Sequence, residues 1–214
     1  PEPARRPMAV AASGGGGGVR SETPSQFAIV AAEDGTQVTI TPSARTYRYG
    51  ATTQTLTLNR GEAYLVQADI RNFAALDLTG TRVVSDKPVA IFAGHQRATI
   101  PLNGGGSRDV LIEQLPPVET WGQSVFLVPY VQPSDASIQQ LNDRFRVMAA
   151  LDNTEVQLDG VVVAQLAAGG FYEGRLDQPR HMTSSAPVLV AQYKQTAKSD
   201  FSNGELGDPF MMLV

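Results

Sequence analysis

The 214-residue sequence contains no cysteine. This absence excludes a disulfide framework, a thiolate zinc site and a cysteine nucleophile. Long apolar runs are missing as well, because none approaches the roughly 20 residues that a transmembrane helix needs. The sequence therefore predicts a protein without cysteine chemistry and without a membrane span.

Basic clusters are also scarce. The 17 Lys and Arg residues are outnumbered by 21 Asp and Glu residues, the net charge is −4, and the only basic cluster is Arg5-Arg6. A nucleic-acid groove or an anionic lipid surface would need a basic patch, so neither partner is expected. Hydrophobic residues make up 42% of the chain, which is too apolar for global disorder and typical of a globular protein.

A sustained helical period is absent from every window, and short runs with β-strand patterning recur instead, separated by Gly, Asn and Asp turn residues. Strands are expected over residues 27–32, 37–41, 55–58, 63–68, 81–84, 89–93, 110–115, 124–131, 145–150, 155–158, 161–166, 170–176, 188–193 and 210–214. Many short strands with little helix predict an all-β sandwich or barrel.

The two ends of the sequence are unusual. Residues 1–26 are rich in Pro, Ala and Gly, which predicts a flexible leader. Within it, the apolar stretch 8–11 is expected to pair as an edge strand. The chain starts with Pro and stops on the apolar run 210–214, whereas chain ends usually lie in water. These features predict a piece of a longer protein that works as part of an assembly.

An internal repeat is the strongest pattern. Residues 27–38 (FAIVAAEDGTQV) align without gaps to residues 145–156 (FRVMAALDNTEV), at an offset of 118. Residues 85–91 (SDKPVAI) align to residues 184–190 (SSAPVLV), at an offset of 99. The second copy is therefore shorter by 19 residues, and a loop such as 45–53 is the expected place of the loss.

The repeat predicts an all-β fold of two tandem copies of one strand-rich, β-sandwich-like unit. We expect a first repeat at residues 27–118 and a second at 119–214, the second truncated at its C-terminus. A strand, an Asp-containing turn and a second strand would form a hairpin in each copy, with Phe27 and Phe145 buried. Pro88 and Pro187 are each expected to open a strand, so that Val89, Ile91, Val188 and Val190 point into the core.

Several runs resemble one known family, the N-terminal domain family of the IgG Fc-binding protein, which also occurs in bacterial surface proteins. The runs are SDKPVAIFAGH (85–95), EQLPPV (113–118), Trp121-Gly122, FRVMA (145–149), DNT (152–154), GGFYE (169–173), PVLVAQY (187–193) and GDPFMM (207–212). Together they cover most of residues 27–214.

The resemblance implies an extracellular, mucus-type or adhesive protein with no catalytic residues. Immunoglobulin binding belongs to a vertebrate member and is not transferred to this chain. Family members often carry cysteines near Arg97 and Arg108, so the loop between these arginines is expected to be looser here. The terminal apolar run of the family usually continues into a Pro-Pro step, which agrees with a truncated chain.

The histidines and aspartates that could bind a metal or act in catalysis do not form a catalytic set. His95 and His181 are not at equivalent repeat positions, so a metal site would need carboxylates from distant loops. Asp34 and Asp152 are repeat equivalents, which favours a shared turn role over the carboxylate pair of a glycosidase. Calcium binding by the Asp-containing turns stays open. No cofactor and no metal are expected.

Three aromatic residues are candidate binding residues. Trp121 follows a Pro-Pro connector, where packing between the repeats is favoured over a stacking platform for a ligand. Tyr47 and Tyr49 lie with Arg45 and Arg48 in the segment that only the first repeat has. Exposed aromatic and basic loops often contact ligands, although a solvated loop is favoured over a ligand contact here.

The function expected from these observations is a non-catalytic structural or adhesive module of a larger secreted or cell-surface protein. Its partners would be other protein chains or an extracellular glycan. The alternatives are a polysaccharide-acting enzyme and a carbohydrate-binding module.

Overall fold

The computed structural model describes residues 23–71, 77–100, 108–130, 143–195 and 209–214. This part of the chain is built of β-strands with one short 3-10 helix, η1 (Val118–Thr120). The strands pair antiparallel in three sheets, which confirms the expected all-β class. Within the described ranges, no helix is long and apolar enough to cross a membrane. The stretch 8–11 and most of the loop between Arg97 and Arg108 lie outside the described residues.

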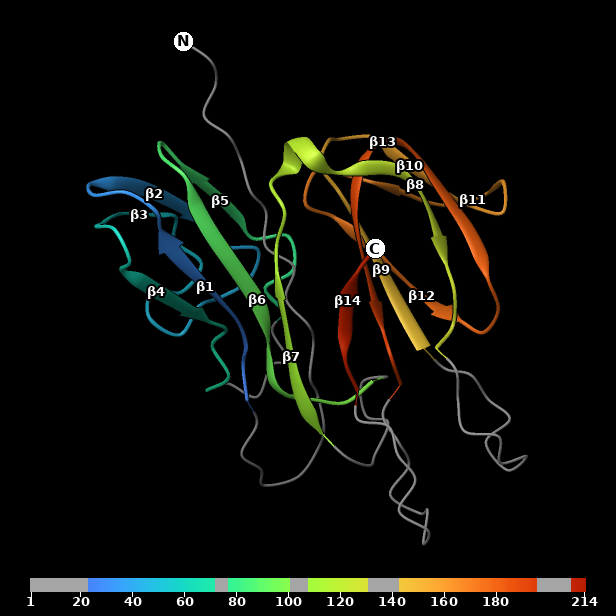
Figure 1. The fold of residues 1–214 in the computed structure, drawn as a ribbon, viewed down its shortest axis with the longest axis horizontal. Helices are drawn as coiled ribbons and strands as arrows, with labels where there is room; N and C mark the ends of the chain where they lie inside the picture. Colours follow the sequence, from blue (N-terminus) through green and yellow to red (C-terminus); the bar gives the residue numbers. More distant parts are fainter. Residues whose placement is uncertain (1–22, 72–76, 101–107, 131–142, 196–208) are drawn as a thin grey trace, which may run out of the picture.

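The first half of the chain forms two facing sheets (Figure 1), with strand orders β4-β1-β6-β7 and β3-β2-β5. Their strands are β1 (Ser25–Ala31), β2 (Thr36–Thr41), β3 (Gln54–Leu58), β4 (Ala63–Gln67), β5 (Arg82–Ser85), β6 (Val89–Ala98) and β7 (Asp109–Gln114). Phe27 and Ile29 of one sheet and Val38 and Ile40 of the other are buried in one cluster. Every second residue is buried, which is the pattern of strands that bury only one face.

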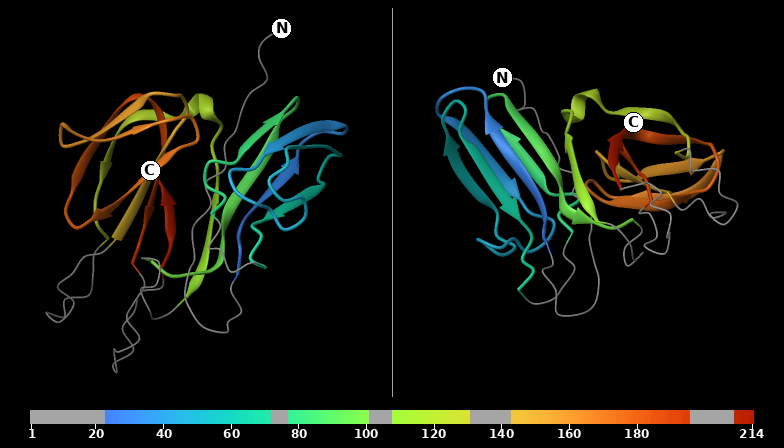
Figure 2. Two further views of the ribbon diagram at one scale, coloured as in Figure 1. Left: turned by 180° about the vertical axis from the view of Figure 1, so that it is seen from behind. Right: turned by 60° about the horizontal axis from the view of Figure 1, so that its bottom comes forward.

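The second half forms a seven-stranded sheet that curls into a half-barrel around one long strand, β13 (Arg180–Tyr193) (Figure 2). The first part of β13 pairs with β8 and β10, and its second part pairs with β9 and β14. The other strands are β8 (Gly122–Leu127), β9 (Asp143–Ala149), β10 (Thr154–Leu158), β11 (Val161–Leu166), β12 (Phe171–Leu176) and β14 (Met211–Leu213).

The expected hairpins over residues 27–38 and 145–156 are wrong. β1 is paired along both edges, by β4 and β6, so β2 has no edge of β1 to join and crosses to the other sheet. β9 is likewise flanked by β12 and β13. The expected burial is confirmed, since Phe27 is 1% and Phe145 0% exposed.

The two prolines differ in their places. Pro88 directly precedes β6, as expected, but Pro187 lies inside β13 rather than at its start. The register of β13 against β8 shifts between Thr183 and Val188. A proline is tolerated inside a strand at such an irregularity, because no ladder hydrogen bond is lost there. Ile91, Val188 and Val190 are buried as predicted, and the half-buried Val89 packs against the same cluster as Ile91.

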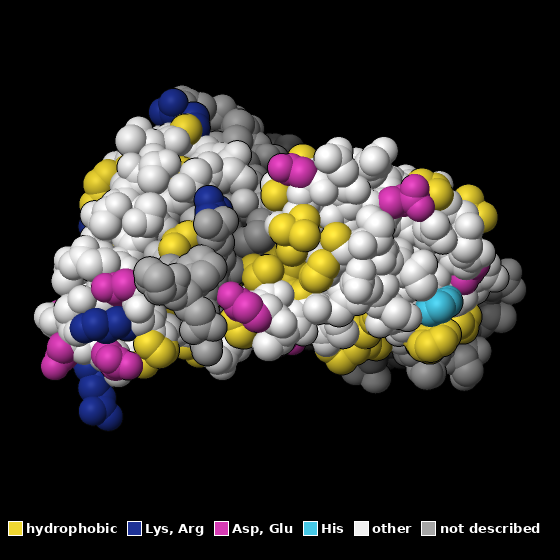
Figure 3. Space-filling model, turned by 90° about the horizontal axis from the view of Figure 1, so that it is seen from above, with side chains coloured by type: hydrophobic (Ala, Val, Ile, Leu, Met, Phe, Trp, Pro, Cys, Tyr) yellow, Lys and Arg dark blue, Asp and Glu magenta, His cyan; other side chains and the backbone are white. Residues whose placement is uncertain are grey.

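The larger of the two hydrophobic clusters spans both halves of the chain. Side chains of the first half share it with Met148, Leu189, Tyr193 and Met211 of the second half. Burial of each such side chain stabilises the fold by about 1.5–3 kcal/mol. Seen from above, hydrophobic side chains gather between the halves, whereas charged side chains of both signs are scattered over that face (Figure 3). The smaller cluster lies within the half-barrel and contains Phe145.

Polar contacts also join the two halves. The guanidinium of Arg146 on β9 binds the Asp77 carboxylate at 2.6 Å and the Thr79 hydroxyl at 2.9 Å. At Gly80, a Cβ atom would collide with the carbonyl oxygen of Gly169, so the two backbones meet at this point. The two halves therefore pack against each other and are not two independent domains joined by a linker.

Candidate binding groove in the first half

The connection between β2 and β3 sets the first half apart. It runs over residues 42–53 and carries Tyr47, Arg48 and Tyr49. The strands β10 and β11 of the half-barrel are joined by two residues, Asp159 and Gly160, both with positive φ, as in a tight hairpin turn. The long connection is thus a feature of the first half alone, and such added loops often carry function.

The tip of this connection is closed by hydrogen bonds around one buried threonine. The Thr46 amide donates to the Gly50 carbonyl at 2.7 Å, and the Gly50 amide donates back to the Thr46 carbonyl at 3.0 Å. The Thr46 hydroxyl also donates to the Gly50 carbonyl, at 2.9 Å. The side chains of Tyr47 and Tyr49 therefore project from a closed turn rather than from an open loop.

The turn is attached to the edge of β4. The Tyr47 amide donates to the Gln67 carbonyl at 2.8 Å, and the Asp69 amide donates to the Arg45 carbonyl at 2.9 Å. In effect the turn adds a very short strand to the sheet, which fixes its position and occupies this part of the sheet edge.

A buried carboxylate anchors the same turn. The Asp69 side chain is 2% exposed and is bound by Arg71 through Nε at 2.8 Å and Nη2 at 3.0 Å. The hydrogen bonds from Arg71 lower the pKa of Asp69 to about 2. Arg71 also donates to the Tyr47 carbonyl at 3.0 Å, and its guanidinium lies 4.7 Å from the centre of the Tyr47 ring. The anion, the cation and the aromatic ring hold one another in place.

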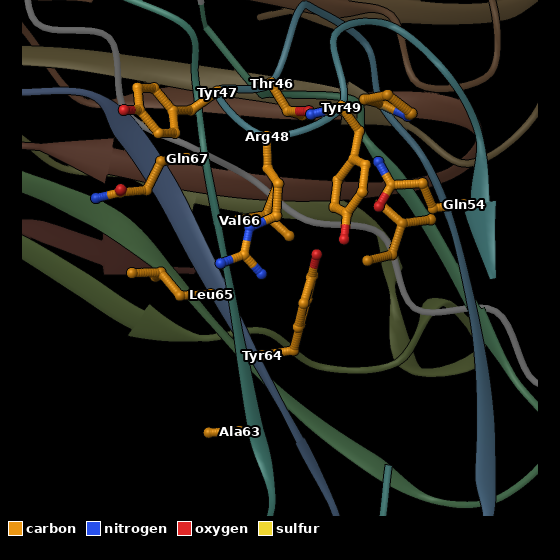
Figure 4. Close-up of a pocket in the computed structure, with 12 residues that line it drawn as sticks. Thr46, Tyr47, Arg48, Tyr49, Gln54, Ala63, Tyr64, Leu65, Val66 and Gln67 are labelled. Atoms are coloured by element: carbon orange, nitrogen blue, oxygen red, sulfur yellow. The ribbon is translucent and has the colours of Figure 1, made fainter. Parts of the chain in front are cut away.

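Between this turn and the edges of the two sheets lies a cavity of about 370 Å³, which we call the tyrosine groove. Its polar lining includes Arg48 and Tyr49 from the turn, Gln54 from β3 and Tyr64 from β4. Figure 4 shows the hydroxyl groups of Tyr49 and Tyr64 pointing toward each other, with the guanidinium of Arg48 beside them. Interaction with these two hydroxyls raises the pKa of Arg48.

The tyrosines differ in their solvation. Tyr47 and Tyr49 are 56% and 45% exposed, whereas Tyr64 is partly buried against the core. Partial burial raises the pKa of Tyr64, while the hydrogen bond with Tyr64 lowers that of Tyr49. The groove thus combines solvent-facing aromatic rings, two hydroxyls and one guanidinium, which suits binding rather than proton transfer.

Trp121 lies elsewhere. Its side chain is 7% exposed, belongs to the cluster shared by both halves, and donates its indole N–H to the Pro116 carbonyl at 3.2 Å. The structure therefore brings Tyr47 and Tyr49 together at one site and leaves Trp121 in the core.

The aspartates of the turns accept hydrogen bonds from backbone amides. The Asp34 carboxylate accepts from the amide of Arg60 at 2.9 Å, and the Asp152 carboxylate accepts from that of Ala168 at 2.9 Å. Asp86 binds the amide of Gln37 at 2.8 Å in the same way. Among the residues that the structure describes, no group of three or more His, Asp or Glu side chains is placed to hold a metal ion.

The two histidines have different surroundings. His95 is 2% exposed on β6, and burial lowers its pKa. His181 stacks on Phe126 at 4.5 Å and contacts the Ser124 hydroxyl at 2.9 Å.

Four residues of the groove and its anchor were not expected from the sequence. They are Gln54, Tyr64, Asp69 and Arg71. Tyr64 lies in a strand pattern and looks like an ordinary core residue. The sequence Asp69-Ile70-Arg71, a charged pair directly after a strand, was the one available signal.

These observations define an all-β domain with a rigid, aromatic and cationic groove, which is the kind of site that a binding protein presents. The chain belongs to the IgGFc binding protein family, whose model matches residues 9–214. The resemblance found in the sequence is thereby confirmed. No curated protein and no solved structure matches the chain. Membership in a family of binding domains indicates a binding role rather than catalysis.

Proposed function

We propose that this protein is a non-catalytic interaction module of a secreted or cell-surface protein, and that it binds an extracellular partner through the tyrosine groove. One observation carries the proposal. Tyr47 and Tyr49 stay 56% and 45% exposed although their turn is fixed by the ion pair between the buried carboxylate of Asp69 and the exposed guanidinium of Arg71. Exposed aromatic rings on a rigid support lose little conformational entropy when they bind, so such rings make efficient contact residues.

The family supports the same reading in general terms. Its name refers to a protein that binds the Fc part of IgG. For this chain we propose only the general property, adhesion to a protein or glycan outside the cell. A location on the cell surface or in the medium follows from the same proposal and from the family.

An enzyme acting on polysaccharides is a weaker alternative. Its carboxylate pair would have to be free and separated by roughly 5–9 Å within one cleft. Asp34 and Asp152 instead each bind a turn amide, one in each half of the chain. We expect Asp34→Asn and Asp152→Asn to lower stability by about 1 kcal/mol each, as the loss of a turn hydrogen bond does. Polysaccharide hydrolysis that these changes abolish without unfolding would favour the enzyme.

We also infer that residues 27–118 and 119–214 are two copies of one structural unit. Equivalent strand pairs support this. Phe27 lies opposite Ala93 as Phe145 lies opposite Gln192, which fits the offsets of 118 and 99 together. The 19-residue difference lies mainly in two connections, which shorten by 10 and 11 residues, and slightly longer strands in the second half offset two of these. Residues 42–53 correspond to 159–160, and residues 68–81 correspond to 177–179. An experimental structure in which the two halves have different strand orders would contradict the duplication.

The comparison of the two halves also predicts a further partner strand for β5. The first part of β13 is paired on both sides, by β10 and β8. In the described residues β5 pairs with β2 only, so its other edge is open to a strand from elsewhere. We propose that this edge joins the module to a larger assembly. The molecular mass in solution across a dilution series tests the idea, and a monomer at every concentration would oppose self-association.

The binding function is tested with the whole 214-residue chain. We expect it to bind members of a glycan array or a panel of immobilised extracellular glycoproteins. The double change Tyr47→Ala and Tyr49→Ala should weaken this binding at least tenfold, as loss of central aromatic contacts does. Phe126→Ala is the matched control, because Phe126 is also an exposed aromatic residue (71%) but lies outside the groove. Equal binding by the groove variant and the control would contradict the proposal.

A further inference from the structure

The geometry points to the carboxylate of an acidic sugar as the group that the tyrosine groove recognises. This inference rests on the proposed function, because it names the chemical class of ligand for that same groove. It is carried by three features: an arginine without a counter-ion among the described residues, two hydroxyls that converge on it, and a sheet edge that the turn partly occupies.

The first feature is the charge of the groove. Arg48 is the only charged residue among the described residues that line it. The ion pairs of the described residues engage Arg45, Arg71, Arg146 and Arg180 but not Arg48. The nearby carboxylate of Asp69 is already held by two contacts with Arg71. In a chain of net charge −4, Arg48 is thus an exposed guanidinium without an acidic partner in the described structure.

The second feature is the arrangement of hydroxyl groups. Tyr49 comes from the turn and Tyr64 from β4, yet their hydroxyls meet beside the Arg48 guanidinium (Figure 4). A guanidinium is a planar fork that binds a carboxylate through two parallel hydrogen bonds. The hydroxyls can donate to the remaining lone pairs of the same carboxylate. A guanidinium also pairs in this way with a tetrahedral oxyanion, but a carboxylate is a more basic acceptor than a sulfate ester and forms the stronger hydrogen bonds.

The third feature favours a sugar over an acidic peptide. An extended peptide would bind most readily by adding to the edge of β4. Beside the groove that edge is partly occupied, because the Gln67 carbonyl and the Asp69 amide already form backbone hydrogen bonds with Tyr47 and Arg45. A cavity of about 370 Å³ is at the lower end of ligand sites and suits one or two sugar rings. The exposed rings of Tyr47 and Tyr49 offer flat apolar faces to the C–H face of a sugar.

The test compares three soluble probes by calorimetry with the full chain: lactose, lactose carrying a terminal sialic acid, and lactose carrying a terminal sulfate. We expect the sialylated probe to bind on the order of 10- to 100-fold more tightly than lactose, the size of a charge-assisted hydrogen-bonded contact. The preference should weaken as salt is added. The sulfated probe should bind less tightly than the sialylated one.

Three variants assign the preference to its residues. Arg48→Gln removes the charge and should abolish the preference for the sialylated probe over lactose. Arg48→Lys keeps a charge without the planar fork and should restore part of the preference. Tyr64→Phe should reduce it by a smaller factor. The side chain of Arg48 is exposed, so its variants are expected to fold, and circular dichroism verifies this.

The outcomes separate this inference from the proposed function. Equal binding of all three probes, lost in Tyr47→Ala, would overturn the acidic ligand and leave the groove as a binding site. A preference for the sulfated probe, or an unchanged preference in Arg48→Gln, would overturn the carboxylate. Binding of a poly-glutamate peptide that competes with the sialylated probe and is equally tight would overturn the sugar. If glycoproteins bind and none of the probes does, the inference fails while the proposed function stands.

Discussion

The Nη1 atom of Arg146 lies 2.6 Å from a carboxylate oxygen of Asp77, and these residues belong to different halves of the chain. Arg146 also binds Glu173 through Nε at 2.8 Å, and its guanidinium faces the rings of Phe171 and Tyr193 at 4.6 and 5.9 Å. Burial lowers the pKa of Arg146, but interactions with Asp77, Tyr193 and Glu173 together raise it by more. Arg146 is therefore charged and fully engaged at the junction of the halves.

Removing this cation should destabilise the whole molecule. We expect Arg146→Ala to lower the free energy of unfolding by about 3 kcal/mol, because it breaks a largely buried ion pair and leaves Asp77 without its partner. Arg82→Ala is the control, since Arg82 is exposed on β5 and the change should stay within about 0.5 kcal/mol. Urea denaturation gives both values. Similar effects for the two variants would show that the junction adds no stability.

The close approach of the two halves at Gly80 predicts a second effect. Gly80 has φ of +86°, and a Cβ atom there would strike the carbonyl oxygen of Gly169. Gly80→Ala should therefore cost at least about 2 kcal/mol, from backbone strain and from separation of the halves. At Gly122 a Cβ atom would meet nothing within 4 Å, so Gly122→Ala should be neutral or slightly stabilising. Thermal denaturation compares the two, and equal midpoints would refute the tight contact.

Removing the hydroxyl of Tyr193 should stabilise the fold. Its side chain is 2% exposed, its hydroxyl has no hydrogen-bond partner among the described residues, and burial raises its pKa. Tyr193→Phe removes the unsatisfied hydroxyl and should stabilise the fold by up to about 1 kcal/mol. Tyr172→Phe, in which the tyrosine is only partly buried, serves as the control. A loss of stability in Tyr193→Phe would mean that the hydroxyl has a partner after all.

The anchor of the tyrosine groove predicts a dependence on pH. Arg71 lowers the pKa of Asp69 from 3.8 to about 2, so the folded state binds this proton less readily than the unfolded state. The resulting stability is fully present above about pH 4 and is lost as the pH falls through about 2. Asp69→Asn should therefore be less stable than the native chain at neutral pH, and the difference should shrink in acid. Unfolding in urea at both ends of this range measures it, and a difference that does not change with pH would contradict the assignment.

The strands were readable from the sequence because each buries one face. Buried and half-buried residues alternate along β1, for example, and β11 has the expected bounds, residues 161–166. The first part of β13 was missed because Pro187 was read as the start of a strand, although a shift in register allows it to lie inside one. The hairpins were wrong for a related reason. Local patterning indicates that two strands follow each other across a turn, but which strand lies beside β1 depends on edges that distant segments fill.

The sequence by itself determined the all-β class, the family, the burial of Phe27 and Phe145, and the segment that carries Tyr47 and Tyr49. Each of these depends on residue type and spacing within a short stretch. Only the tertiary structure decided that Trp121 is in the core and that Tyr64 and Asp69 meet the turn of Tyr47. The physical reason is that these contacts depend on the packing of long loops. That packing brings two sheets together and supplies a counter-ion from another connection, and no local sequence pattern predicts it.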